Sequence, residues 1–202
     1  MKERPIFEEV FSQLARQSDF WLKLLIGGLL SFIPVVNFFA FGYLYRFSLK
    51  VRRSGQLVLP EWRDWPGLFT DGLKFAVVWL TYWLLPLLIA SAVSAGLSAL
   101  GLGALSYLLL SSLLFVSPLL FCSALYRLQM RADFKDLLDV PLIIRITYHH
   151  FPRLMVPALA FLGICALGLP LYGCALFSGF LLLIAHTGLS YRAMQMRKAA
   201  AA

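Results

Sequence analysis

Three long runs of uncharged, mostly apolar residues dominate the chain and alternate with short charged segments. The runs cover residues 24–45, 75–126 and 154–191, which are 22, 52 and 38 residues long. A buried helix of a soluble protein is apolar for about 10–14 residues, whereas a membrane-spanning helix needs about 20. The pattern therefore predicts an all-α integral membrane protein.

The two longer runs have the length and punctuation of helical hairpins. Residues 75–126 fit two spans of about 20 residues joined by a glycine-rich turn near Gly101. Residues 154–191 break at Gly168 and Pro170, and the first half of this run has only about 16 residues, which is short for a full span. We therefore expect the second hairpin either to thin the bilayer locally or to stop short of the far surface.

The first run, residues 24–45, allows two topologies. As one helix it would rise about 33 Å and cross a hydrocarbon core of ~30 Å, with a kink at Pro34. As a hairpin broken at Pro34 and Asn37, each arm would reach about 15 Å, or half the membrane. We favour the re-entrant hairpin because a single span would place the basic N-terminus outside. The kinked single span remains the alternative.

The charged residues set the orientation of these runs. The chain is 60% hydrophobic and 14% charged, with a net charge of +8. All Lys and Arg residues lie in four segments, which are residues 1–23, 46–74, 127–153 and 192–202. Because cytoplasmic loops collect Lys and Arg, we place all four on the cytoplasmic side of a bacterial inner membrane. We expect one membrane domain, residues 1–202, with about five or six membrane helices or half-helices arranged as hairpins.

Amphipathic segments precede each apolar run on the cytoplasmic face. These segments are residues 1–23, 59–74 and 133–153, and residues 192–202 form a cytoplasmic tail. Tryptophan favours the headgroup level, and Lys or Arg near a membrane attracts anionic lipids. The residues we expect to anchor the protein to lipid headgroups are Trp21, Arg46, Lys50, Arg52, Arg53, Trp62 and Trp65. The flanking of membrane segments by these cations argues against nucleic-acid binding.

Several short motifs resemble a family of small multi-pass prokaryotic membrane proteins, domain of unknown function 4013. The matching residues are Trp21, Gly27-Gly28, Ile33-Pro34, Gly42-Tyr43, Arg46, Leu59-Pro60-Glu61-Trp62, Asp64, Asp71-Gly72, His186 and Gly188. The resemblance is strongest over residues 19–86; the middle matches in hydropathy and the end loosely. It implies a membrane location and a helical architecture, without an established activity.

Few residues carry chemistry. No carboxylate lies inside an apolar run, where burial would raise its pKa and suit it to acid–base catalysis. We therefore do not expect an enzyme. No cofactor or metal site is expected from the residue spacing. His186 is the one candidate ligand, for a heme or chlorophyll-type pigment, although a histidine bonded to ordinary neighbours is the simpler interpretation.

Small residues and helix breaks offer the remaining functional signal. Gly27, Gly28 and Gly42 permit close helix packing, and Pro34 and Pro170 interrupt helices. We therefore expect a non-enzymatic accessory or scaffolding subunit that packs against other membrane protein subunits or their lipids. The alternatives are a transporter or channel component for a neutral or lipid-like solute, and a pigment-binding subunit that uses His186.

Overall fold

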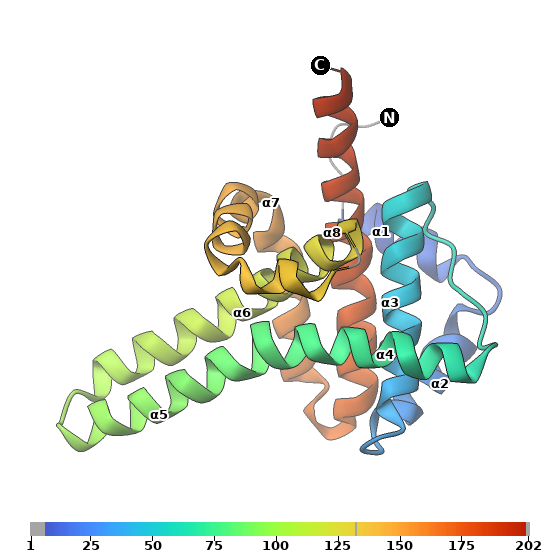
Figure 1. Cartoon of the computed structure of the whole chain (residues 1–202). Coiled ribbons are helices and arrows are strands. Elements are labelled where there is room, and N and C mark those ends of the chain that lie inside the picture. Colours follow the sequence, from blue (N-terminus) through green and yellow to red (C-terminus); the bar gives the residue numbers. More distant parts are fainter. Residues whose placement is uncertain (1–6, 132, 201–202) are drawn as a thin grey trace. The chain divides into compact units, whose positions relative to one another are not determined.

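The computed structural model describes residues 7–131 and 133–200, with side chains at 7–130 and 133–196. The start of the expected segment 1–23 and the end of the tail 192–202 lie outside this range. The described chain is helical (Figure 1). The elements are α1 (Phe7–Ala15), α2 (Phe20–Ser31), α3 (Asn37–Ser54), α4 (Trp65–Trp79), η1 (Leu80–Leu84), α5 (Leu85–Ala99), α6 (Gly103–Arg131), η2 (Phe134–Leu138), α7 (Val140–Leu167), η3 (Leu169–Leu171) and α8 (Tyr172–Ala200).

Four helices in the described chain are long and apolar enough to cross a membrane. They cover Trp65–Ala99, Gly103–Met130, Val140–Leu167 and Leu169–Met196. The first is one continuous helix made of α4, η1 and α5, and α2 is a shorter apolar helix. These helices confirm the predicted all-α class and the predicted membrane protein.

The first apolar run forms two helices that turn back on each other. α2 ends at Ser31, α3 begins at Asn37, and the two helices pack together. Pro34 has no N–H to continue a helix, and the next residue, Val35, has a φ of 72°. A positive φ is unfavourable for a β-branched residue and stops the helix here. The break thus lies where the hairpin interpretation puts it.

Two helices begin earlier than the apolar pattern alone indicates. α4 begins at Trp65, inside the segment 59–74, and α7 begins at Val140, inside the segment 133–153. The carboxylates of Asp64 and Asp139 accept hydrogen bonds from the N–H groups of Gly67 and Leu142, both at 3.2 Å. A helix starts where its first N–H groups find such a cap, and this position is independent of where the lipid begins.

The described helices form two compact units. Unit 1 contains α1, α2, α3, the part of α4 up to Ala76, the part of α7 from Arg153, and α8. Unit 2 contains residues Val77–Pro152. The chain therefore passes between the units inside α4 and again inside α7.

In unit 1, α8 is surrounded by α1, α2 and α3, and runs parallel to α3 (Figure 1). At one end, the Tyr172 hydroxyl donates to the Phe32 carbonyl at 3.0 Å. At the other end, the Arg192 guanidinium donates to the carbonyls of Arg52 and Arg53 in the last turn of α3. The buried core is rich in aromatic rings, because Phe47, Phe75, Phe161, Phe177 and Phe180 are almost fully enclosed.

In unit 2, α5 and α6 form a hairpin whose turn contains Gly101, with a φ of 77°. The Ser98 hydroxyl donates to Ser106 Oγ at 3.0 Å, and the Ser94 hydroxyl also bonds to Ser106. The π turn η1 precedes α5 because Pro86 has no N–H to donate.

Candidate functional site

Two glycines allow α3 and the first turns of α4 to cross with their backbones in contact. A Cβ on Gly42 would overlap the carbonyl oxygen of Leu68, and a Cβ on Gly72 would overlap the carbonyl oxygen of Phe38. A larger residue at either position would have to push one helix backbone away from the other. The crossing therefore requires glycine and fixes where α4 meets α3.

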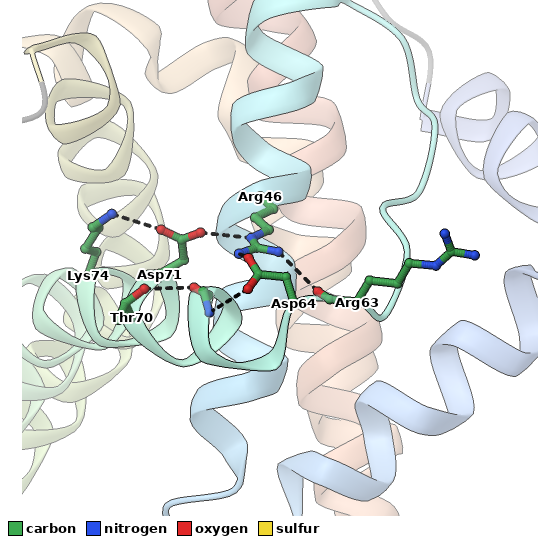
Figure 2. Close-up of polar contacts among 7 residues, drawn as sticks. Arg46, Arg63, Asp64, Thr70, Asp71 and Lys74 are labelled. Atoms are coloured by element: carbon green, nitrogen blue, oxygen red, sulfur yellow. Dashed lines mark hydrogen bonds and ion pairs between the residues drawn. The ribbon is translucent and has the colours of Figure 1, made fainter.

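The segment between α3 and α4, residues 55–64, is named the connector. Arg46 joins the crossing helices to this connector (Figure 2). Its Nε donates to Asp71 Oδ2 at 2.9 Å, and its Nη2 donates to Asp64 Oδ2 at 2.7 Å. Its Nη1 also donates to the carbonyl oxygen of Arg63 at 3.3 Å. One planar guanidinium thus contacts α4 and two residues of the connector, a geometry that the point charge of a lysine would not reproduce.

The two carboxylates around Arg46 have second partners. Asp71 Oδ1 accepts from Lys74 Nζ at 2.9 Å, and the Asp71 side chain is 19% exposed. Asp64 Oδ1 accepts from the backbone N–H of Gly67 and so caps α4. We name Arg46, Asp64, Asp71 and Lys74 the Arg46 cluster. Both carboxylates accept hydrogen bonds from cations of the cluster, which suits a structural clamp better than a general base.

A second ion pair ties the connector to α2. Lys23 Nζ lies 2.7 Å from Glu61 Oε1, and the lysine side chain is nearly buried whereas the glutamate is exposed. The hydrogen bond from Lys23 and its positive charge lower the pKa of Glu61. The hydrogen bond from Arg46, followed by that from the Gly67 N–H, lowers the pKa of Asp64. Both connector carboxylates are therefore stabilised as anions.

Aromatic stacking also holds the connector against the helices of unit 1. The Trp62 ring stacks on Tyr43 with centroids 4.2 Å apart, and Phe177 of α8 lies beside both rings. Trp62 also stacks on Trp65 at 6.1 Å. These contacts hold the chain between α3 and α4 against the bundle, so that the charged side chains of the connector keep a fixed position.

The residues predicted to anchor the protein to lipid headgroups differ from one another in their surroundings. Trp21, Arg53 and Trp65 are exposed, and Lys50 and Arg52 are half-buried. Arg46 and Trp62 are directed into protein contacts, where we expected lipid headgroups. Asp64 and Asp71 lie seven residues apart at the start of α4, which marks them as a candidate pair of acceptors, but their spacing does not identify Arg46 as the shared partner.

The glycines predicted to permit packing lie at helix contacts of unit 1, whereas Pro170 lies in a turn. A Cβ on Gly27 would overlap the Phe177 ring, and one on Gly28 would meet Cys174, so both glycines face α8. Pro170 lies in η3, the turn between α7 and α8. Arg192, which caps α3, was missed because its partners are backbone carbonyls, and these leave no trace in the sequence.

His186 lies in the core of unit 1. The residue is 5% exposed, and its ring centroid is 6.4 Å from that of Phe7 in α1. Within the described residues, no group of three or more His, Cys, Asp or Glu side chains is placed to hold a metal ion.

The fold and the site define a multi-pass membrane protein whose charged residues join helices. The chain belongs to the family described as "Protein of unknown function (DUF4013)", whose model matches residues 26–178. No curated protein and no solved structure matches the chain. The resemblance to this family is thereby confirmed. Eight of the motif residues named in the sequence analysis are helix or connector contacts of unit 1, namely Gly27, Gly28, Gly42, Arg46, Trp62, Asp64, Asp71 and Gly72.

Proposed function

We propose that the protein is a non-enzymatic accessory or scaffolding subunit that packs against another membrane protein through the outer face of α5. The observation that carries this proposal is a row of small residues on that face. Ala92, Ala95, Gly96 and Ala99 recur at helical spacing, and all four are exposed. Small residues let a second helix approach closely in a membrane, where packing contacts drive association.

The contrast with the other small-residue faces supports this choice. Gly27, Gly28 and Gly42 are covered by α8 or α4, and Ser94 faces Ser106 of α6. Contacts within the chain already occupy these positions. A Cβ on Gly96 meets nothing within 4 Å, so this position is open to a partner.

The charged residues support a structural role. The cations nearest to the helix crossing, Arg46 and Lys74, are paired with Asp64 and Asp71. The exposed Arg53 at the end of α3 suits contact with anionic headgroups, in keeping with a subunit that also binds lipids.

The test uses Gly96→Leu in the full-length protein, expressed in its own host and extracted with a mild detergent. The new side chain has room in the folded chain but would hold a partner helix away. We expect the wild type to migrate on native gels with a second membrane protein at fixed stoichiometry, and Gly96→Leu to lose it. Gly163→Leu is the matched control, because a Cβ at Gly163 also meets nothing within 4 Å.

Two results would contradict the proposal. One is a wild-type protein that migrates as a free monomer in every mild detergent. The other is a complex that contains only copies of this chain, because an accessory subunit requires a different partner. Equal melting temperatures for Gly96→Leu and the wild type would show that loss of the partner is not a folding defect.

A further inference from the structure

One end of unit 1 is an uncharged apolar surface made by two turns. We name it the tip and define it as residues 32–36, between α2 and α3, and 167–172, between α7 and α8. The turns lie together, because the Phe32 and Tyr172 rings are 4.8 Å apart at 69°. The tip exposes Ile33, Val35, Leu167, Leu169 and Leu171, with Leu167 reaching 89%. Such a surface is characteristic of contact with lipid or protein.

Three helices that leave the tip reach a charged residue after a short distance. In α2, Lys23 precedes Ile33 by about ten residues, or roughly 15 Å of helix. In α3, Arg46 follows Asn37 at about 14 Å, and in α7, Arg153 precedes Leu167 at about 21 Å. A full span needs about 30 Å of apolar length, so these helices have only about 45% to 70% of it.

α8 is the exception, and its burial explains why. Arg192 follows Tyr172 by about 30 Å of helix, which would suffice for a span. However, 61% of its most apolar stretch is buried inside the protein, against 22% for the helix Trp65–Ala99. Residues 179–188 are all buried, in a helix that α1, α2 and α3 surround. The distal half of α8 is therefore apolar because it is a protein core.

The exposed apolar side of unit 1 has a height similar to these short helix lengths. α2 exposes Leu22, Leu25 and Leu29 between the tip and Trp21, and Trp21 is itself exposed. From Ile33 to Trp21 the apolar wall is about 18 Å high, and a tryptophan at its upper edge is typical of the headgroup level.

We propose that unit 1 enters only one leaflet of the bilayer, with its tip near the midplane and acyl chains of that leaflet around its walls. The Arg46 cluster and the Lys23–Glu61 pair then lie at the headgroup level. The exposed side chains of Glu61, Arg63 and Asp64 are solvated there. If α8 crossed the whole bilayer instead, these exposed charges would lie in hydrocarbon, at a cost of several kcal/mol.

The experiment measures the accessibility of single cysteines in membrane vesicles of both orientations. Cys122, Cys165 and Cys174 are first replaced by alanine, and gel filtration checks the fold. Single cysteines are then introduced as Val35→Cys and Leu169→Cys at the tip, Gln56→Cys near the Arg192 end of unit 1, and Leu100→Cys in the α5–α6 turn. All four positions are exposed. The probe is a charged maleimide that does not cross membranes.

We expect Gln56→Cys to react from one side only and Leu100→Cys from the opposite side only. Val35→Cys and Leu169→Cys should react from neither side until the vesicles are dissolved in a denaturing detergent. Reaction of the tip cysteines from the side that labels Leu100→Cys would overturn the proposal, because unit 1 would then cross the membrane. Reaction from the side that labels Gln56→Cys would overturn it as well, because the tip would then lie outside the bilayer.

A depth measurement gives an independent readout. Nitroxide labels at Trp21, Leu25, Leu29 and Val35 are compared for collision with oxygen, which enters hydrocarbon, and with a nickel chelate, which stays in water. The ratio of oxygen to nickel accessibility should rise steadily from Trp21 to Val35. A maximum at Leu25 or Leu29, followed by a fall toward Val35, would mean that the tip emerges on the far side and would refute insertion into one leaflet.

Discussion

Unit 1 and unit 2 are both helical and apolar, yet different interactions stabilise them. In unit 1 the helices contact each other through glycine crossings, stacked rings and ion pairs. In unit 2 the α5–α6 hairpin is joined by serine hydroxyls and exposes Leu100, Tyr107 and Leu108. The difference indicates that hydropathy alone does not distinguish a helix that is apolar toward lipid from one that is apolar toward protein.

The largest expected effect is at the glycine crossing of unit 1. Gly42→Ala places a methyl group on the carbonyl of Leu68, and rigid backbone cannot move away without separating α3 from α4. We expect a loss of about 3 kcal/mol in the free energy of unfolding, which lowers the melting temperature by roughly 10 °C for a chain of this size. Thermal unfolding in mild detergent measures it. Gly96→Ala in unit 2 is the control, and should not lower the melting temperature.

The second-largest expected loss of stability follows removal of the Arg46 guanidinium. Arg46→Gln leaves Asp71, which is 19% exposed, with only Lys74 as an ionic partner, and breaks the link to Asp64. We expect a loss of about 2 kcal/mol, because the cluster is only partly buried. Arg53→Gln, at an exposed position, should change stability by less than about 0.5 kcal/mol. Arg46→Lys should resemble Arg46→Gln, since lysine has no planar fork; wild-type stability of Arg46→Lys would contradict the clamp.

The hydroxyl contact in unit 2 should contribute less. Ser106→Ala removes the partner of Ser94 and Ser98, and hydrogen bonds between membrane helices contribute on average about 0.6 kcal/mol. We expect a fall in melting temperature of about 2 °C. Ser112→Ala is the matched control, because its hydroxyl bonds to the Leu108 carbonyl of its own helix. If Ser106→Ala matched the loss seen for Arg46→Gln, the proposed contrast between the units would be wrong.

The smallest effect concerns the exposed carboxylate Asp64. Its folded pKa lies below its ordinary value of 3.8, so its ionised form stabilises the fold fully above that value. This contribution disappears as the pH falls toward the lower folded pKa. Wild type should therefore melt slightly above Asp64→Asn at pH 7, and the difference should shrink by pH 3. A difference that is constant with pH would indicate that Asp64 acts only as a neutral cap.

Much of the fold could be predicted because it follows from local patterns. Uncharged runs predict membrane helices, Pro34 predicts the break between α2 and α3, and the glycines near Gly101 predict the α5–α6 turn. Hydropathy does not reveal the starts of α4 and α7, because Asp64 and Asp139 cap these helices before the apolar runs begin.

The candidate site was predictable only in part. The family motif pointed to Gly42, Arg46, Asp64 and Asp71 as separate positions, and the expected anchoring of Arg46 and Trp62 in lipid headgroups did not predict their contacts within the protein. Arg46 and Asp71 are 25 residues apart in the chain, and a pattern with a period of 3.6 residues carries no information on such a contact.

The sequence by itself determined the class of protein, the helical segments and the positions of the breaks, because each depends on residues within about one helix length. Only the tertiary structure decided which charges pair, which glycines are covered and which face of α8 meets protein. Those outcomes depend on how helices cross, and a helix crossing is set by shape and close contact between residues far apart in the chain.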